Sequence, residues 1–259
     1  MTPTATPSCA IVTGAAHGLG VGIARRLLVD GWCVLAADIS PELDERFEPG
    51  AFDGRVRTAV VDIADVDAPE ALVRAAMVSF GRVDAVVNNA GIGGPGGDLD
   101  TVAMADVVRT LDVNLLGAVR LCRAAIPHLK AQRSGRIVNI GSVYAQRPVV
   151  GGSAYVMAKA ALHGLSQCLA LELGPFGITV NTVAPGYMLT RMHEEEIELQ
   201  AERAGIDAAQ MLQRLRDEVP LGRHGTDDDV AGAVSWLLSD DASYVTGQTI
   251  GVNGGIVVS

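Results

Sequence analysis

Seven short apolar runs recur along the chain, and a segment with helical periodicity follows most of them. The runs are rich in β-branched residues and barely alternate between apolar and polar positions. Such runs are typical of strands that are buried on both faces of a parallel sheet. The predicted strands span residues 9–12, 33–37, 56–61, 83–87, 137–140, 178–183 and 249–252.

Helices are predicted between these strands. Leu19, Ile23 and Leu27 repeat at i+4 ahead of Gly31, which is a plausible helix stop. Further helical patterns cover residues 71–80, 101–133 (with room for two helices), 154–173 and 230–238. Because strands alternate with helices, we predict an α/β fold in which right-handed crossovers build a doubly wound, seven-stranded parallel sheet with helices on both faces.

No linker or repeat interrupts this pattern, so we expect a single domain over residues 1–259. The irregular stretch at 187–225 is predicted to be an insertion that covers the substrate. It holds an acidic run at 193–198, and a charge run is usually the solvated face of a helix. A lid over a pocket is the alternative, since long insertions often serve binding sites.

Composition narrows the class of protein. With 49% hydrophobic and 19% charged residues, the chain is not mainly disordered. A net charge of −10 argues against binding to nucleic acid, which needs clustered Lys and Arg. Residues 1–24 carry no charged side chain, but the Pro and Gly residues there argue against a targeting or bilayer-spanning segment. No CxxC pair exists, so we expect no metal site, and we predict a soluble cytoplasmic protein without membrane or nucleic-acid partners.

A glycine-rich stretch and an acidic residue end the first two predicted strands. The stretch reads Thr13-Gly14-Ala15-Ala16-His17-Gly18-Leu19-Gly20. Glycines let the backbone approach a pyrophosphate, and the helix that follows offers free N–H groups, so we predict that Gly14, His17, Gly18, Leu19 and Gly20 bind a nucleotide. Asp38 follows at the spacing where a carboxylate accepts both ribose hydroxyls and repels a 2′-phosphate. With no Lys or Arg in the glycine stretch, the cofactor is predicted to be NAD rather than NADP. Ile39, Asp62 and Ile63 are predicted to lie at its adenine end, although Asp62 could equally cap a helix.

Polar residues also follow the later strands. Asn88 and Asn89 predict a structural or cofactor hydrogen-bond network, because buried amides need partners. Ser142 comes after the fifth strand, and Tyr155 and Lys159 follow four residues apart on one face of a helix. Tyrosine ionises near pH 10, and a neighbouring ammonium favours the phenolate. We therefore expect Lys159 to lower the pKa of Tyr155, Tyr155 to act as acid/base and Ser142 to donate to the substrate oxygen.

These motifs, in this order, resemble those of the short-chain dehydrogenase/reductase family in its form with a single Rossmann-like domain. The resemblance covers residues 10–257. It rests on TGxxxGxG at 13–20, NNAG at 88–91, YxxxK at 155–159 and PG at 185–186. His17 stands where many NADP-using members carry Arg, which also favours NAD.

The resemblance implies an NAD-dependent oxidoreductase that interconverts a secondary alcohol (polyol, diol, sugar or cyclic alcohol) and its ketone. The implied catalytic tetrad is Asn114, Ser142, Tyr155 and Lys159, in which Asn114 holds a helix carbonyl and a water that joins Lys159 to bulk solvent. Further implied cofactor contacts are Asn89, Ala90, Gly91, Tyr155, Lys159, Pro185, Gly186, Met188 and Thr190. Candidate substrate-lining residues are Ser142, Tyr144, Gln146, Tyr155, Tyr187 and Met192. Members are usually homotetramers that pair through helices near 101–133 and 153–174.

Two other functions stay open at this point. A 3-oxoacyl-[acyl-carrier-protein] reductase is the alternative, and Lys130, Arg133 and Arg136 could give it a basic patch. Phe176, where those relatives carry a basic docking residue, and Asp38 argue against it. A non-catalytic NAD(H)-sensing protein would keep the glycine stretch but would not need the Ser-Tyr-Lys set.

Overall fold

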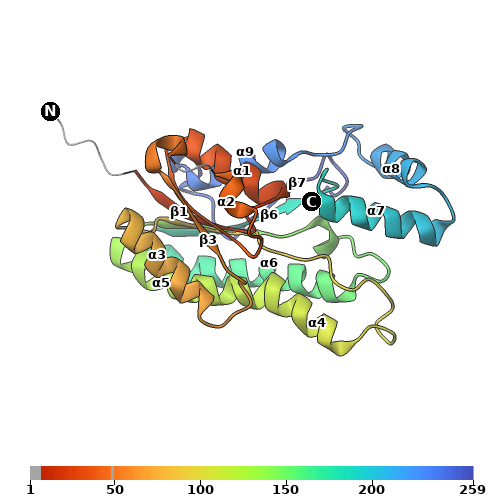
Figure 1. Cartoon of the computed structure of the whole chain (residues 1–259), viewed down its shortest axis with the longest axis horizontal. Coiled ribbons are helices and arrows are strands. Elements are labelled where there is room, and N and C mark those ends of the chain that lie inside the picture. The colour runs from red at the N-terminus through yellow and green to blue at the C-terminus, as the bar shows by residue number, and fades with distance from the viewer. Residues whose placement is uncertain (1–6, 48–49, 259) are drawn as a thin grey trace.

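One seven-stranded parallel sheet forms the centre of the computed structural model, which describes residues 7–47 and 50–258 (Figure 1). The strands are β1 (Cys9–Thr13), β2 (Cys33–Asp38), β3 (Val56–Val60), β4 (Ala85–Asn88), β5 (Gly135–Ile140), β6 (Ile178–Pro185) and β7 (Thr249–Val252). They lie in the order β3-β2-β1-β4-β5-β6-β7, and all neighbours pair in parallel. The predicted strands and the doubly wound sheet are confirmed.

Helices cover both faces of the sheet, which explains why every residue of the inner strands β1, β4 and β6 is buried (Figure 1). The helices are α1 (Gly18–Val29), α2 (Leu43–Arg46), α3 (Ala68–Phe80), α4 (Met104–Leu111), α5 (Gly117–Gln132), α6 (Ser153–Leu173), α7 (Arg191–Ala204), α8 (Ala208–Asp217) and α9 (Asp227–Leu238). One hydrophobic core joins α1 and α9 to one face, and a second joins α3, α5 and α6 to the other.

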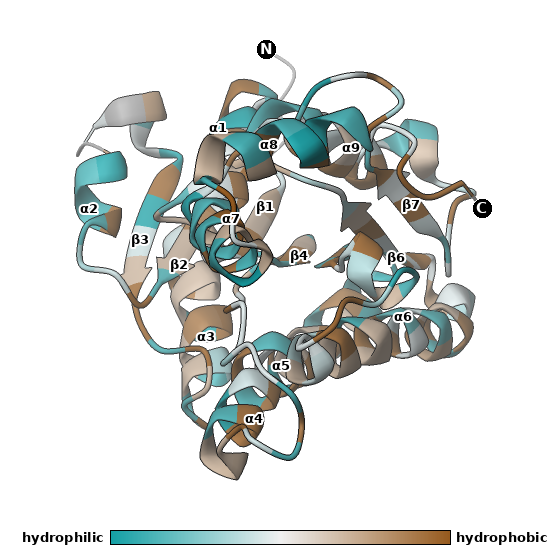
Figure 2. Ribbon diagram, turned by 90° about the vertical axis from the view of Figure 1, so that its right-hand side faces the viewer, coloured by the Kyte–Doolittle hydropathy of each residue, from teal (hydrophilic) through white to brown (hydrophobic). Residues whose placement is uncertain are grey.

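The strand order reverses between β1 and β4, because the chain builds outward to β3 and then returns to continue at β4. Loops that leave the carboxyl ends of such strands diverge, and the crevice between them is where ligands bind in open α/β sheets. Figure 2 looks onto this edge of the sheet, with α7 in front of the strand ends.

The segment predicted to hold two helices is almost continuous. α4 passes into α5 through a π-helical turn at Asp112–Leu116, rather than through a loop. π-helical turns are rare in proteins, and those that occur are often found at functional sites. This one buries Asn114, which is 1% exposed.

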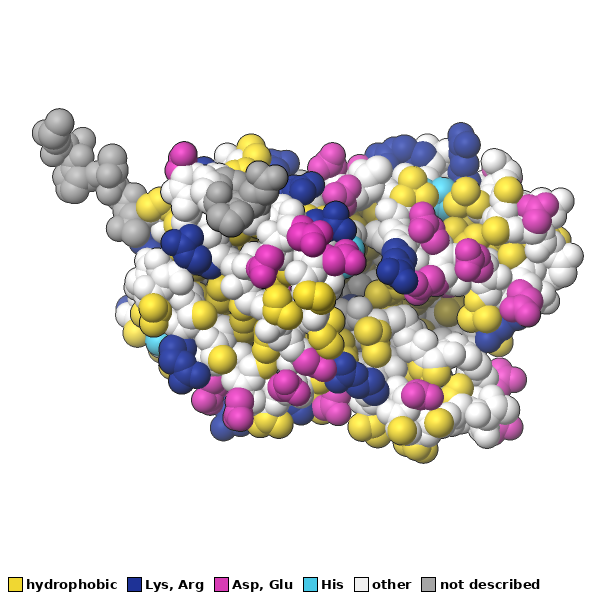
Figure 3. All heavy atoms as spheres, in the orientation of Figure 1, with side chains coloured by type: hydrophobic (Ala, Val, Ile, Leu, Met, Phe, Trp, Pro, Cys, Tyr) yellow, Lys and Arg dark blue, Asp and Glu magenta, His cyan; other side chains and the backbone are white. Residues whose placement is uncertain are grey.

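The segment 187–225, predicted to be irregular, is largely helical. α7 packs against α8, and its buried face repeats at i+4 through His193, Ile197 and Ala201. The acidic run is therefore mainly a solvated helix face, and Figure 3 shows acidic side chains over α7. Glu196 is the exception, because it turns inward. Among the described residues, no helix combines the length and apolar character needed to cross a bilayer.

Candidate active site

The turn after β1 is built for close approach of the backbone. Gly14 and Gly18 have φ values of +66° and +51°, which side chains rarely adopt. A Cβ at Gly14 would lie 2.8 Å from the Cα atom of Ala90, and a Cβ at Gly20 would overlap the carbonyl oxygen of Gly14. Gly20 thus allows α1 to pack closely against the turn, and it does not line the cavity described below.

The N-terminus of α1 follows this turn directly, and the first N–H groups of a helix have no partner within the helix. Its N-cap residue, His17, makes no capping hydrogen bond, and the first turn holds no acidic residue. The His17 ring instead lies 2.8 Å from Glu42, at the rim. A helix end that no side chain caps fits a pyrophosphate, because the N–H groups and the helix dipole both favour an anion there.

Asp38 is fixed at the carboxyl end of β2. Its Oδ2 accepts from Ala16 N at 2.9 Å and its Oδ1 accepts from Ser40 N at 2.9 Å. A small adjoining cavity of about 120 Å³ is lined in part by the three residues predicted at the adenine end, Ile39, Asp62 and Ile63. Arg109, which sequence reasoning missed, lines the same cavity and pairs with Asp62 at 2.7 Å.

The two asparagines after β4 hold the framework. Asn89 Nδ2 donates to the carbonyl oxygens of Thr13 and Gly14 at 2.9 and 3.0 Å, so it anchors the glycine turn. Asn88 Nδ2 donates to Asn139 Oδ1 at 2.7 Å and joins β4 to β5. The sequence predicted a structural or a cofactor hydrogen-bond network at these asparagines, and the bonds described here are structural.

Ser142, Tyr155 and Lys159 meet beyond the end of β5. Ser142 is 7% exposed, and α6 presents Tyr155 and Lys159 one turn apart. Lys159 Nζ donates to the carbonyl oxygen of Ile140 at 2.8 Å and lies 5.6 Å from the centre of the Tyr155 ring. The three side chains line one cavity.

Asn114 stands behind this group. Its Oδ1 accepts from Ile92 N at 2.7 Å, and its Nδ2 donates to Ile92 O at 2.8 Å. Its amide is therefore bonded to the loop after β4 rather than to a helix carbonyl. A Cβ at Gly91 would lie 3.3 Å from Asn114 Oδ1 and 3.5 Å from Lys159 Nζ. Because Gly91 has no side chain, both groups can lie close to its backbone.

Burial dominates the ionisation of the two titratable side chains. It raises the pKa of Tyr155 to about 12, although a hydrogen bond from Ser142 lowers that pKa in part and the charge of Glu196 raises it. Burial lowers the pKa of Lys159 to about 8. The shift in the pKa of Tyr155 is opposite to the expected one, because burial of the phenol outweighs the hydrogen bond that lowers the pKa.

A cavity of about 330 Å³ brings most of the predicted site together. Of the predicted residues, it is lined by Gly14, His17, Gly18, Leu19, Asp38, Asn89, Ala90, Gly91, Ser142, Tyr144, Tyr155, Lys159, Pro185, Gly186, Tyr187, Met188, Thr190 and Met192. Thr190 caps α7 and lies over the glycine turn, since a Cβ at Gly18 would be 3.3 Å from its Cγ2. Gln146 is not part of this lining. It is exposed, because the tight turn at Val143–Ala145 carries the chain out to the surface.

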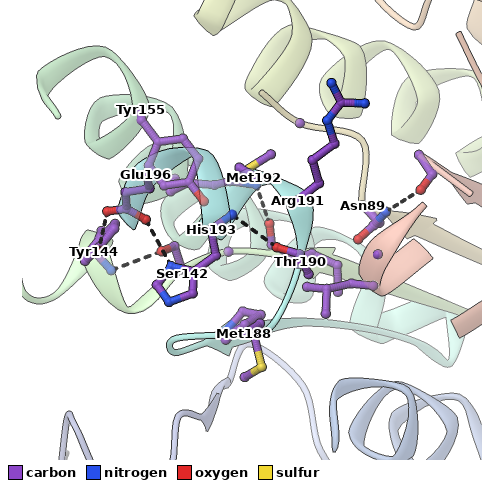
Figure 4. Close-up of a pocket in the computed structure, with 18 of the residues that line it drawn as sticks. Asn89, Ser142, Tyr144, Tyr155, Met188, Thr190, Arg191, Met192, His193 and Glu196 are labelled. Carbon is purple, nitrogen blue, oxygen red and sulfur yellow. Dashed lines mark hydrogen bonds and ion pairs between the residues drawn. The ribbon is translucent and has the colours of Figure 1, made fainter. Parts of the chain in front are cut away.

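Three lining residues from α7 were not predicted from the sequence. They are Arg191, His193 and Glu196 (Figure 4). Glu196 accepts a hydrogen bond from Tyr144 Oη at 2.6 Å, and the His193 ring stacks on that of Tyr187 with centroids 5.4 Å apart. The i+3 spacing of His193 and Glu196 was the available signal.

A glycine turn at a helix N-terminus, joined in one cavity to a Ser-Tyr-Lys group, defines a dinucleotide-dependent oxidoreductase. Comparison with known proteins agrees. Residues 14–257 match a family model described as enoyl-(acyl carrier protein) reductase. The chain belongs to the short-chain dehydrogenase/reductase family, as its motifs predicted.

Relatives in this family differ in substrate. The chain is 38% identical to 3beta-hydroxysteroid dehydrogenase 1 of Eggerthella lenta, over 96% of this chain and 93% of that protein. It is 36% identical to a 3-oxoacyl-[acyl-carrier-protein] reductase of Thermotoga maritima, over 96% of this chain and 97% of that protein. The structure of an NAD⁺-bound xylitol dehydrogenase is similar with a TM-score of 0.90 and 30% identity, over 97% of this chain and 100% of that one.

Proposed function

We propose that the protein is an NAD-dependent dehydrogenase that interconverts a secondary alcohol (polyol, diol, sugar or cyclic alcohol) and its ketone. The observation that carries the proposal is the single cavity that Ser142, Tyr155 and Lys159 share with Asp38 and the glycine turn. The named activities of the hydroxysteroid and xylitol relatives support a secondary alcohol as substrate.

Each residue of the site has a separate proposed role, which follows from its position in the cavity. Tyr155 takes the proton of the carbinol hydroxyl, and Ser142 donates a hydrogen bond to the same oxygen. Lys159 supplies positive charge beside the phenol and binds the nicotinamide ribose, while Thr190 contacts the carboxamide. The glycine turn and α1 hold the pyrophosphate, and Asp38 accepts the ribose hydroxyls. The chemistry that NAD supplies when bound is hydride transfer at its nicotinamide ring.

Alcohol oxidation is expected to accelerate with pH and then level off. The active form, with Tyr155 ionised and Lys159 protonated, holds one proton fewer than the form that predominates at low pH. The fraction of enzyme in this active form therefore rises tenfold per pH unit up to about pH 8, where Lys159 loses its own proton. Above about pH 8 the fraction stays constant, because the predominant form then holds as many protons as the active form. The plateau therefore begins near the pKa of Lys159, although the pKa of Tyr155 is about 12. Initial rates give kcat/KM for the alcohol at each pH. A profile that is flat between about pH 6 and about pH 8, with hydride transfer rate-limiting, would remove Tyr155 as the base.

Asp38 is expected to set cofactor preference. NADH should bind at least about tenfold more tightly than NADPH, because the carboxylate repels a 2′-phosphate. The Asp38→Ala variant should narrow this ratio mainly by admitting NADPH. Dissociation constants from fluorescence titration measure it, with Asp100→Asn as a control at an exposed carboxylate outside both cavities. Equal affinities in the wild type would contradict the role given to Asp38.

The proposed activity is tested by following NADH absorbance in a substrate screen. With NAD, the screen covers secondary alcohols, vicinal diols, polyols and aldoses. An acetoacetyl thioester with NADH or NADPH provides the reverse reaction. Turnover of one class of alcohol supports the proposal, whereas turnover of the thioester alone overturns it in favour of the acyl-carrier reductase.

One surface feature favours that second candidate. Lys130 Nζ lies 4.7 Å from the centre of the Phe176 ring, and the Arg133 guanidinium lies 6.0 Å from it, so two cations gather where an acidic carrier could dock. Arg136 is turned toward Asp240 instead, at 3.5 Å. Asp38, which disfavours NADP, favours the dehydrogenase over this candidate.

We further propose a homotetramer that pairs through helices near 101–133 and 153–174. In support, α4 and α6 leave the apolar side chains of Val108, Met157 and Leu171 exposed.

The complete Ser-Tyr-Lys set disfavours a non-catalytic NAD(H)-sensing protein.

A further inference from the structure

Glu196 is a carboxylate held inside the reaction cavity. It lies on α7, lines the same cavity as Ser142 and Tyr155, and its side chain is 29% exposed (Figure 4). Burial alone would raise its pKa, but hydrogen bonds from His193, Tyr144 and Gln200 outweigh that effect and the pKa is lowered. The group is therefore an anion at neutral pH.

The hydrogen bonds of Glu196 leave one of its oxygens underused. Oε1 accepts from Tyr144 Oη at 2.6 Å and from Gln200 Nε2 at 2.8 Å. Among the residues that the structure describes, Oε2 has only the His193 Nδ1 contact, at 3.4 Å. An ionised carboxylate can accept about four hydrogen bonds, so Oε2 has capacity for a further donor. The orientation is fixed, since Tyr187 stacks on His193.

This carboxylate lies near the proposed reacting centre. The ring of Tyr144, which bonds Glu196, meets the ring of Tyr155 edge-on with centroids 6.4 Å apart. The negative charge of Glu196 also raises the pKa of the Tyr155 phenol. A substrate whose carbinol oxygen contacts Tyr155 therefore has a fixed acceptor within the same cavity.

We propose that Glu196 determines specificity by accepting a hydrogen bond from a second hydroxyl of the substrate, so that diols and polyols are preferred to mono-alcohols of the same carbon skeleton. The inference rests on the proposed dehydrogenase function. A hydroxyl fits better than an ammonium group, because Lys159 and Arg191 line the same cavity and would repel a cation. An anionic substituent would be repelled by Glu196 itself.

The experiment compares matched pairs of substrates with NAD. The pairs are butane-2,3-diol with butan-2-ol, and cyclohexane-1,2-diol with cyclohexanol. In the wild type, kcat/KM should be about tenfold or more higher for the diol of each pair, as expected for a hydrogen bond to a charged acceptor. In Glu196→Leu the ratio should fall to about one while turnover of the mono-alcohol persists, and in Glu196→Gln it should fall partway. The control variant is Glu198→Gln, an exposed glutamate of the same helix that does not line the cavity and should keep the wild-type ratio.

The outcomes separate the two proposals. A wild type that oxidises both members of each pair equally keeps the dehydrogenase function and overturns the role of Glu196. A ratio that stays high in both Glu196 variants also overturns it, as does a preference for 3-aminobutan-2-ol over butane-2,3-diol. If no secondary alcohol is oxidised, the proposed function and this inference fall together. Should Glu196→Leu fail to fold, the wild-type ratio and Glu196→Gln decide.

Discussion

Replacement of Tyr155 by phenylalanine is expected to lower kcat by about 10²- to 10⁴-fold and to leave the dissociation constant of NADH unchanged. The variant removes only the hydroxyl that is proposed to exchange a proton with the substrate oxygen. The ring, which meets Tyr144 edge-on with centroids 6.4 Å apart, keeps its packing. Steady-state rates with the best alcohol of the screen and a fluorescence titration with NADH measure the two quantities.

Tyr244→Phe provides the matched control for this loss. Tyr244 is fully exposed, so the loss of its hydroxyl should change neither quantity. Retention of turnover in Tyr155→Phe would show that another group transfers the proton. A sensor that does no chemistry would keep its biological activity in Tyr155→Phe, which distinguishes it from an enzyme.

Replacement of Gly20 by alanine is expected to destabilise the fold by about 3 kcal/mol and to weaken NADH binding by at least about tenfold. A Cβ at this position would overlap the carbonyl oxygen of Gly14, so α1 must move away from the glycine turn. That movement shifts the helix N-terminus proposed to hold the pyrophosphate. Thermal unfolding and NADH titration measure the two effects.

The control for this substitution is Gly174→Ala. Gly174 has a φ of −52°, and a Cβ there would meet nothing within 4 Å. Its substitution should leave NADH binding as in the wild type. If Gly20→Ala also bound NADH normally, the close packing of α1 on the turn would not be needed for the cofactor.

The parts of the molecule that follow from local pattern were predictable. Buried strands are recognised by short apolar runs that are rich in β-branched residues, and a glycine turn between a strand and a helix is typical of nucleotide binding. The grouping of Ser142, Tyr155 and Lys159 followed from the rule that parallel strands end at one edge. The pKa shifts of Tyr155 and Lys159 were not predictable, because they depend on how completely the fold buries the two side chains.

Features that depend on distant contacts were not predictable. Glu196 belongs to a run of acidic side chains that resembles a solvated face, and its inward bond to Tyr144, 52 residues away in sequence, leaves no mark in the local pattern. Gln146 leaves the cavity because of a single tight turn. The helices of 187–225 had a visible signal in the i+4 repeat of His193, Ile197 and Ala201, which the acidic residues between them obscured.

The position of Thr190 has a consequence for anyone who wishes to redesign this cavity. Thr190 lies over Gly18 and is also the residue from which α7 starts, and Glu196 follows less than two turns later on that helix. One rigid rod thus borders both ends of the cavity. Engineering a wider substrate range through α7 will change dinucleotide affinity as well, so selection for a new alcohol has to be run at several NAD concentrations.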